Sequence, residues 1–135
     1  MDMKLELVIV PVSDVDRAKA FYVDRAGFNL DVDHRPSETF RVVQLTPPGS
    51  ACSITIGVGL SDMTPGTLKG LHLVVDDIVA AREELVGRGV EVSEVRHMGE
   101  GGWESGPDPA HSKYNSFADF TDPDGNYWLL QEVRR

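Results

Sequence analysis

The pattern of apolar and polar residues occurs twice along the chain. Leu5–Tyr22 and Leu68–Leu85 align residue by residue, and in each an apolar run of strand length ends at a polar pair. Apolar residues spaced three and four apart follow, and this spacing places them on one face of a helix. They are Val15, Ala18 and Tyr22 in the first copy and Ile78, Ala81 and Leu85 in the second. The repeat therefore predicts two modules that each begin with a strand and an amphipathic helix.

Capping residues are predicted at both ends of each helix. Ser13 and Asp76 stand just before the helical spacing, where a side-chain oxygen accepts hydrogen bonds from the free amides of the first turn. Gly27 and Gly89 follow the helices, and glycine readily takes the positive φ that ends a helix. We therefore expect each helix to lie between its two capping residues.

The residues after each helix predict three further strands. They are expected at Phe28–His34, Phe40–Thr46 and Ala51–Gly57, and again at Val90–Arg96, Phe117–Thr121 and Asn126–Val133. Turn sequences join the last two strands of each copy, Pro47-Pro48-Gly49 and Asp122-Pro123-Asp124-Gly125. Met98–Ser116 is rich in glycine and proline without periodicity, so we expect a loop there and a candidate lid. Each copy is thus a β-α-β-β-β module, the first at about 4–60 and the second at about 67–134.

The two modules are expected to pair within one α+β domain spanning residues 1–135, because a single module leaves a face of its sheet uncovered. Their curved mixed sheets would enclose a cleft, with the helices outside, and such clefts are where small molecules usually bind. Ser61–Gly66, which contains Pro65, is the predicted linker between the modules.

Three motifs resemble the vicinal oxygen chelate superfamily, which includes glyoxalase I, bleomycin-resistance proteins, fosfomycin-resistance proteins and extradiol dioxygenases. They are PVSDVDRAKAFY at Pro11–Tyr22, VVDDIVAA at Val74–Ala81 and DPDGNYWLLQE at Asp122–Glu132. The resemblance extends over nearly the whole chain and implies the paired-module fold. It also implies a homodimer, because two-module members often dimerise. Function does not follow from fold, so the site residues are considered one at a time.

In the metal-dependent members of that superfamily, one residue from each of four strands, usually His, Glu or Gln, holds a divalent ion. The resemblance places these ligand positions at Leu7, Ser53, Gly70 and Leu129. Leucine and glycine side chains have no lone pair, and neutral serine is a poor ligand for such metals, so we expect no metal cofactor. The alternative is a displaced metal site built from His34, His97 and His111, none of which has a partner at metal-ligand spacing.

Strand alternation decides which side chains face the cleft. The expected cleft residues are Leu5, Leu7, Ile9, Ala51, Ser53, Thr55, Gly70, His72, Val74, Tyr127, Leu129 and Gln131. We expect ligand contacts from Leu7, Ile9, Ser53, Thr55, Gly70, Tyr127, Leu129 and Gln131, together with Trp103 of Gly99–Gly106, which either closes over the ligand or anchors its loop. Such an apolar lining with a few polar groups suits a partly hydrophobic small molecule. Cys52 and Trp128 are expected to face away from the cleft.

His72 is the candidate catalytic residue. A histidine titrates near neutral pH and can move a proton in a dry cleft, so His72 could act as a general acid or base. The alternative is a hydrogen-bonded histidine that only lines the pocket. Tyr127 has two interpretations as well, since it could orient or protonate a ligand or be half-buried for packing.

Charge and composition exclude several classes of partner. The chain has 13 basic and 22 acidic residues, a net charge of −9, so nucleic acids and anionic membrane surfaces are poor partners. Its longest apolar runs, Leu7–Val12 and Leu71–Val75, are too short to cross a membrane, and the N-terminus has no secretory pattern. The single cysteine, Cys52, excludes an internal disulfide. These features predict a cytoplasmic protein.

Three functions stay open as hypotheses. The first is binding of a small molecule without chemistry, as in the drug-sequestering members of the superfamily. The second is a metal-independent lyase or isomerase reaction, with His72 as general base and hydrogen bonds that hold developing negative charge. The third is assembly with a protein partner. A metal-dependent glyoxalase or dioxygenase reaction is disfavoured because each depends on the metal. Whether the chain is an enzyme stays open.

The residues at the four ligand positions predict the metal content of the protein. Protein purified without a chelator or affinity tag is expected to hold no stoichiometric metal, and added Zn²⁺, Ni²⁺, Mn²⁺ or Fe²⁺ is expected to be removed by dialysis. Elemental analysis by mass spectrometry checks this. One tightly held ion per chain would contradict the assignment of ligand positions and would make metal-dependent chemistry the leading hypothesis.

Overall fold

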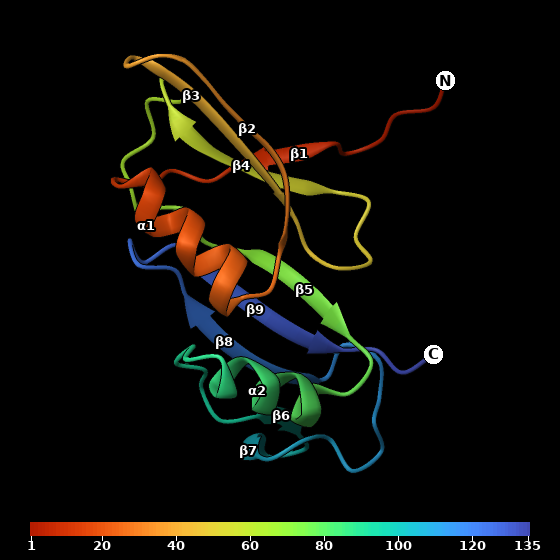
Figure 1. Ribbon diagram of the computed structural model, residues 1–135. Helices are drawn as coiled ribbons and strands as arrows, with labels where there is room; N and C mark the ends of the chain where they lie inside the picture. The colour runs from red at the N-terminus through yellow and green to blue at the C-terminus, as the bar shows by residue number, and fades with distance from the viewer. The chain divides into compact units, whose positions relative to one another are not determined.

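The computed structural model describes residues 1–135 and has the expected α+β architecture, with two open mixed sheets (Figure 1). The chain forms two compact units: the first contains residues 1–68 and 122–126, and the second contains residues 69–121 and 127–135. The turn at 122–126 therefore belongs to the first unit, although the strands on either side of it belong to the second. None of the helices has the length and apolar character needed to span a membrane.

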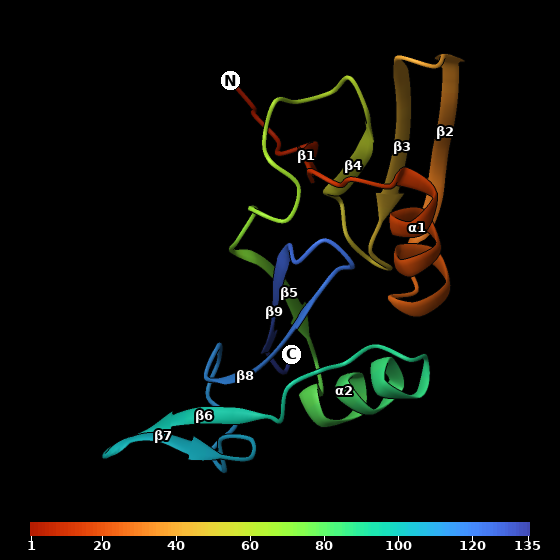
Figure 2. The ribbon, with the colours of Figure 1, turned by 90° about the vertical axis from the view of Figure 1, so that its left-hand side faces the viewer.

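The first unit contains a four-stranded sheet and one helical segment (Figure 2). Its strands are β1 (Leu7–Ile9), β2 (Asn29–Ser37), β3 (Phe40–Thr46) and β4 (Ser53–Val58), in the order β1-β4-β3-β2. β1 runs parallel to β4, and the other pairs are antiparallel. The helix α1 (Val15–Ala20) continues directly into a π-helical turn, η1 (Phe21–Arg25). The strand predicted at Phe40–Thr46 is confirmed.

The apolar face predicted for the first helix is buried in this unit. Val15, Ala18 and Tyr22 are at most 8% exposed. The helix packs on β4, and the apolar side chains that fill this core from the strands are Val43, Leu45, Ile54 and Ile56. Full burial of a large apolar side chain contributes about 1.5–3 kcal/mol, so this packing holds the helix on the sheet.

The turn Asp122–Asn126 is held in the first unit by buried hydrogen bonds. The Asp122 carboxylate accepts one from the Tyr22 hydroxyl and one from the Asn126 side-chain amide, both at 2.8 Å. That amide also donates to the Pro11 carbonyl at 2.8 Å, and its oxygen accepts from the Leu68 amide at 3.1 Å. Tyr22, Asp122 and Asn126 are at most 3% exposed, so removing one partner would leave a buried polar group unsatisfied.

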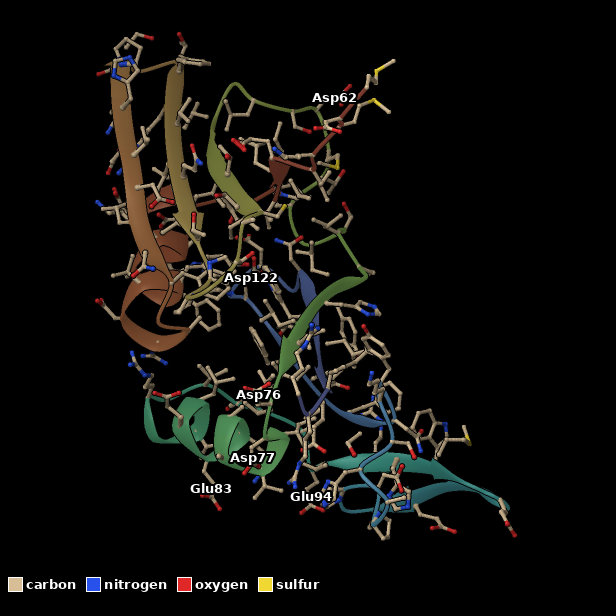
Figure 3. All side chains as sticks on the ribbon, turned by 90° about the vertical axis from the view of Figure 1, so that its right-hand side faces the viewer. Asp62, Asp76, Asp77, Glu83, Glu94 and Asp122 are labelled. Carbon is tan, nitrogen blue, oxygen red and sulfur yellow. The ribbon has the colours of Figure 1, made fainter.

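The N-terminal caps of the helices lie one residue later than predicted. Asp14 caps α1, and Asp77, labelled beside Asp76 in Figure 3, caps α2 (Ile78–Gly87); each accepts from the amide three residues on. Ser13 is not the cap, because its hydroxyl donates to Asp124 of the 122–126 turn at 2.5 Å instead. Positive φ angles of 79° and 94° follow the two helices as expected, at Gly27 and Gly89.

The second unit contains a five-stranded sheet that α2 covers on one face. Its strands are β5 (Leu71–Val75), β6 (Arg96–Gly99), β7 (Gly102–Ser105), β8 (Ser116–Thr121) and β9 (Tyr127–Glu132), in the order β5-β9-β8-β6-β7. β5 and β9 are parallel, and the other pairs are antiparallel. Trp128, Leu130 and Glu132 are buried on the face toward α2, where Glu132 accepts from the Ile78 amide at 3.0 Å.

Two predictions for the second module are wrong. Val90–Arg96 is not a strand, and the strand that pairs with β8 begins only at Arg96. Ser93 keeps the segment irregular, because its amide donates to the Asp119 carbonyl and its hydroxyl accepts from the Asp119 amide. Met98–Ser116 is not a loop throughout, since its first part completes the β6–β7 hairpin (Figure 2). Trp103 therefore lies in a strand.

An ion-pair cluster joins α1 to the β2–β3 hairpin of the first unit. The Arg41 guanidinium, 8% exposed, donates to both carboxylate oxygens of Asp33 at 3.1 and 3.0 Å and to Asp16 at 2.8 Å. Lys19 of α1 also donates to Asp33, at 2.8 Å. The bonds from Arg41 and then from Lys19 hold the pKa of Asp33 well below its usual range.

Asp33→Asn is expected to lower the free energy of unfolding by about 1–2 kcal/mol near neutral pH, because Arg41 and Lys19 lose a charged partner. Since the pKa of Asp33 is lowered in the folded state, its stabilisation is present above the ordinary value of 3.8 and is lost as the pH falls through the lowered value. The difference between wild type and variant should therefore shrink on acidification to about pH 2.5. Urea unfolding at neutral pH and at about pH 2.5 measures this difference in the free energy of unfolding. Glu38→Gln, at the tip of the same hairpin, is the control. A difference that is the same at both pH values would contradict this assignment.

Candidate functional site

The face of the second unit's sheet that α2 does not cover gathers the side chains predicted for that module. We call it the open face. It carries, from β5 across to β6, His72, Val74, Tyr127, Leu129, Gln131, Phe117, Asp119 and Arg96. Residues that pair across strands share a face, so the alternation predicted along β5 and β9 is confirmed. Gly70 lies one residue before β5.

Five side chains at one end of the open face form a group that we call the Trp103 cluster. The Trp103 indole packs edge-on against Phe117, with ring centroids 5.3 Å apart, and the Arg96 guanidinium lies 5.4 Å from the Trp103 ring. Arg96 forms an ion pair with Asp119 at 3.0 Å, and the Tyr127 hydroxyl donates to the same carboxylate at 2.9 Å. Trp103 itself is 57% exposed, so much of the indole faces solvent.

The charge of Asp119 is compensated inside this cluster. Arg96 supplies the opposite charge, and Tyr127 supplies a hydrogen-bond donor. Burial first, and then the bond to Asp119, raise the pKa of Tyr127 above its ordinary value of 10.0, so the phenol stays protonated at neutral pH. In this geometry the hydroxyl hydrogen is directed at Asp119 and is not available to protonate a bound molecule.

His72 is exposed on the open face and is held at one ring nitrogen. Its Nδ1 lies 2.8 Å from the side-chain oxygen of Gln131. The Gln131 amide nitrogen in turn donates to the Tyr114 carbonyl at 3.3 Å. The other imidazole nitrogen, Nε2, is therefore the one available to a bound molecule.

A loop formed by residues 108–115 borders this pair and is ordered by hydrogen bonds. The Asp108 carboxylate accepts from the Ala110 amide, the Asn115 side chain and the Ser112 amide, and these bonds lower the pKa of Asp108 to about 2. His111 Nδ1 lies 2.8 Å from the Glu132 carboxylate. The sequence predicted none of these contacts, and it did not predict Arg96, Tyr114, Phe117 or Asp119 as site residues. For Phe117 and Asp119 the available signal was the alternation along the predicted strand Phe117–Thr121, which places both on one face.

In the first unit, the sheet face away from α1 carries the other predicted ligand contacts. Leu7 pairs with Ser53, and Ile9 pairs with Thr55. The Ser53 hydroxyl forms a hydrogen bond with the Thr46 hydroxyl at 2.6 Å and accepts another from the Gln44 side-chain amide at 3.2 Å. The buried Thr55 hydroxyl has no hydrogen-bond partner. A cleft that these residues share with His72 stays a prediction.

Two residues predicted to lie on this face are outside the strands, because the strands begin later than predicted. Leu5 precedes β1 and is 71% exposed, and Ala51 precedes β4. Cys52 also precedes β4, so its predicted orientation by alternation does not apply. Trp128 does face away from the open face, stacked on Phe120 at a centroid distance of 6.1 Å.

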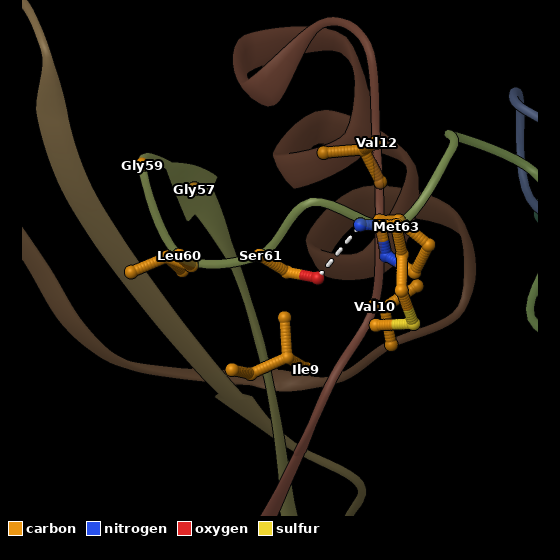
Figure 4. A pocket seen from close by; sticks show the side chains of 9 residues that line it. Ile9, Val10, Val12, Gly57, Gly59, Leu60, Ser61 and Met63 are labelled. Carbon is orange, nitrogen blue, oxygen red and sulfur yellow. Dashed lines mark hydrogen bonds between the residues drawn. The ribbon is translucent and has the colours of Figure 1, made fainter.

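The first unit also contains a small cavity beside β1 and β4 (Figure 4). Its lining includes Ile9, Val12, Leu60 and Met63, and its volume is about 50 Å³. Clefts that bind drug-sized molecules are on the order of 300–1,000 Å³, so this cavity has room only for water.

The residues at the predicted ligand positions do not fit a divalent metal. Leu7 and Ser53 lie side by side, and neither is a good donor. In the second unit Gly70 precedes β5 and has no donor atom in its side chain, and the residue that pairs with Leu129 is His72. A single imidazole bonded to an amide is not a sufficient donor set, and no group of three or more His, Cys, Asp or Glu side chains is placed to hold a metal ion.

The three histidines of the alternative metal site have separate environments. His34 is exposed on β2, and His111 bonds to Glu132. His97 is buried, with 6% of its surface exposed, and its ring bonds to the Gly106 carbonyl at 2.7 Å and to Glu104 at 3.1 Å. The β6–β7 hairpin explains this burial, because it places Glu104 directly opposite His97.

Comparison with known proteins identifies one family and several similar structures. A model of the Glyoxalase/Bleomycin resistance protein/Dioxygenase superfamily matches residues 4–130. The crystal structure of TnmS3, an antibiotic binding protein from Streptomyces sp. CB03234, is 35% identical, with 97% of this chain and 96% of that chain covered and a TM-score of 0.75. A glyoxalase/bleomycin resistance protein from the same organism is 36% identical, with 95% and 99% covered and a TM-score of 0.72. The uncharacterized protein YetH from Bacillus subtilis (strain 168) is 26% identical, with 98% of this chain and 100% of YetH covered.

Proposed function

We propose that this chain, which belongs to the Glyoxalase/Bleomycin resistance protein/Dioxygenase superfamily, binds a partly apolar small molecule on the open face of its second unit. The Trp103 cluster carries the proposal, because it combines an exposed indole, a neighbouring phenyl ring and a compensated ion pair on one sheet face. Apolar and aromatic surface with a few fixed polar groups is the usual composition of a ligand site. The description of TnmS3 as an antibiotic binding protein supports a ligand of that general kind.

Each part of the open face has a proposed role. Trp103 and Phe117 supply flat apolar surface, Tyr127 and Leu129 continue it along β9, and Gln131 adds a polar amide. At Gly70 no atom lies within 4 Å of the position a Cβ would take, which leaves room for a ligand. On the first unit's sheet, the predicted ligand contacts stay Leu7, Ile9, Ser53 and Thr55. The predicted homodimer and cytoplasmic location are part of the same proposal.

Trp103→Ala is expected to weaken the binding of a flat aromatic probe at least about tenfold, because it removes the largest exposed ring of the cluster. Suitable probes are metal-free bleomycin and 8-anilinonaphthalene-1-sulfonate, with affinities measured by isothermal titration calorimetry. Probe contact should also quench the fluorescence of Trp103 in the wild type and leave the buried Trp128 unaffected.

Val86→Ala is the matched control for this measurement. Val86 is 45% exposed on α2, which covers the opposite face of the same sheet, so its truncation should leave the affinity unchanged. The proposal is wrong if neither probe binds saturably, or if Trp103→Ala and Val86→Ala both bind as tightly as the wild type.

A second candidate function is a metal-independent lyase or isomerase reaction with His72 as the general base. The observation that favours it is the His72–Gln131 pair, which engages Nδ1 and leaves Nε2 to accept a proton from a ligand. Binding alone requires no such group, so the two functions differ in the role of His72.

His72→Ala separates the two candidate functions. If His72 is a general base, turnover of a bound ligand is insensitive to EDTA and falls at least about 100-fold in the variant, while binding changes little. If the function is binding alone, the wild type leaves the ligand intact and the variant still binds it. Chromatography of the ligand after prolonged incubation measures this, and His34→Ala in the other unit is the control.

A further inference from the structure

We propose that the loop formed by residues 108–115, anchored on Glu132, selects the tautomer of His72 through the carbonyl of Tyr114. The positioning residues in this proposal are His111, Tyr114, Gln131 and Glu132. Its importance for ligand chemistry rests on the function proposed above, but the contacts themselves and the test below involve no ligand.

The first step is the orientation of the Gln131 amide. The Tyr114 carbonyl can only accept a hydrogen bond, so Gln131 turns its nitrogen toward it, at 3.3 Å. The side-chain oxygen of Gln131 is then the atom 2.8 Å from His72 Nδ1. Because that oxygen cannot donate, Nδ1 of His72 must carry the hydrogen. Neutral His72 therefore presents an unprotonated Nε2 to the open face.

The second step is the position of the Tyr114 carbonyl. The Tyr114 amide donates to the Glu132 carbonyl at 2.9 Å, and His111 Nδ1 lies 2.8 Å from the Glu132 carboxylate. Glu132 is 1% exposed and also accepts from the Ile78 amide at 3.0 Å. Burial alone would raise the pKa of Glu132, but the bonds from Ile78 and His111 lower it overall, so the carboxylate stays charged. The loop is thus held at two points by one rigid residue of β9.

The third step is that the loop needs these anchors to keep its shape. His111 and Tyr114 have φ of 49° and 63°, in the left-handed region that residues other than glycine rarely adopt. Such conformations persist only where surrounding contacts hold them. Asn115 supplies a further anchor, because its side chain exchanges two hydrogen bonds with the backbone of Met98, at 3.2 and 3.0 Å.

The consequence is a defined chemical preference at the site. A neutral histidine side chain in water favours the tautomer protonated at Nε2, whereas this network enforces the tautomer protonated at Nδ1. The Nε2 lone pair then suits a ligand group that donates a hydrogen bond or gives up a proton, such as a hydroxyl or an acidic C–H. A carbonyl oxygen would find no donor on neutral His72.

Long-range ¹H–¹⁵N correlation spectra of the full chain test the proposal. The chain has four histidines, and His72→Ala identifies the signals of His72. At about pH 8.5, where free imidazole is neutral, we expect wild-type His72 to be protonated at Nδ1. In Gln131→Leu the signals should revert to the Nε2-protonated form. In His111→Ala the population should shift the same way, because the loop loses its side-chain anchor to Glu132.

Two variants separate this positioning role from general loss of structure. His111→Asn keeps a donor at the δ position and tolerates a positive φ, so it should retain the wild-type tautomer. His34→Ala, an exposed histidine of the first unit, should have no effect. If His111→Ala does not fold, Asn115→Ala replaces it and should show the same shift.

The proposal is overturned if wild-type His72 is protonated at Nε2 or if Gln131→Leu leaves its tautomer unchanged. It is also overturned if the folded loop variant, His111→Ala or Asn115→Ala, leaves the tautomer unchanged. The test uses no ligand, so its outcome is independent of the proposed binding function. If the tautomer is confirmed but the chain binds neither probe, only the proposed binding function is wrong.

Discussion

The placement of side chains on the open face depends on one buried carboxylate, that of Asp122. It accepts hydrogen bonds from Tyr22 and Asn126 side chains and from the amides of Asp124 and Asn126. These bonds fix the turn between β8 and β9, and pairing on either side of that turn begins with Thr121 opposite Tyr127. A shift of one residue would send the alternate side chains of a strand to the other face. The turn therefore decides that Asp119, Tyr127 and Gln131 share the open face.

The open face differs in charge from the chain as a whole. The protein carries a net charge of −9, but the one carboxylate in the Trp103 cluster, Asp119, is bonded to Arg96 and Tyr127. Several acidic side chains labelled in Figure 3, such as Asp62 and Glu83, are exposed and belong to other segments. The net charge of the protein therefore affects the rate at which a charged ligand approaches it. Recognition of the ligand depends instead on the charge-compensated groups and aromatic rings of the open face.

Membership in the superfamily explains the fold and leaves the chemistry to individual residues. At the positions that the resemblance predicts for metal ligands, this chain has Leu7, Ser53, Gly70 and Leu129, and His72 pairs with Leu129. We propose binding through rings and hydrogen bonds on the open face, with Nε2 of His72 as a hydrogen-bond acceptor. Glu132 and the loop at 108–115 connect this nitrogen to the packing of α2, since Glu132 bonds to both His111 and Ile78.

Features that arise from local periodicity could be predicted from the sequence. The buried stripe of Val15, Ala18 and Tyr22, the strand at Phe40–Thr46 and the shared face of His72 and Gln131 all follow from spacings of a few residues. The tertiary structure was needed to show that His72 pairs with Leu129, that Ser13 bonds to Asp124 instead of capping α1, and that Trp103 packs against Arg96 and Phe117. Strand register and the choice between hydrogen-bond partners depend on groups far apart in the chain, and a local sequence pattern carries no information about them.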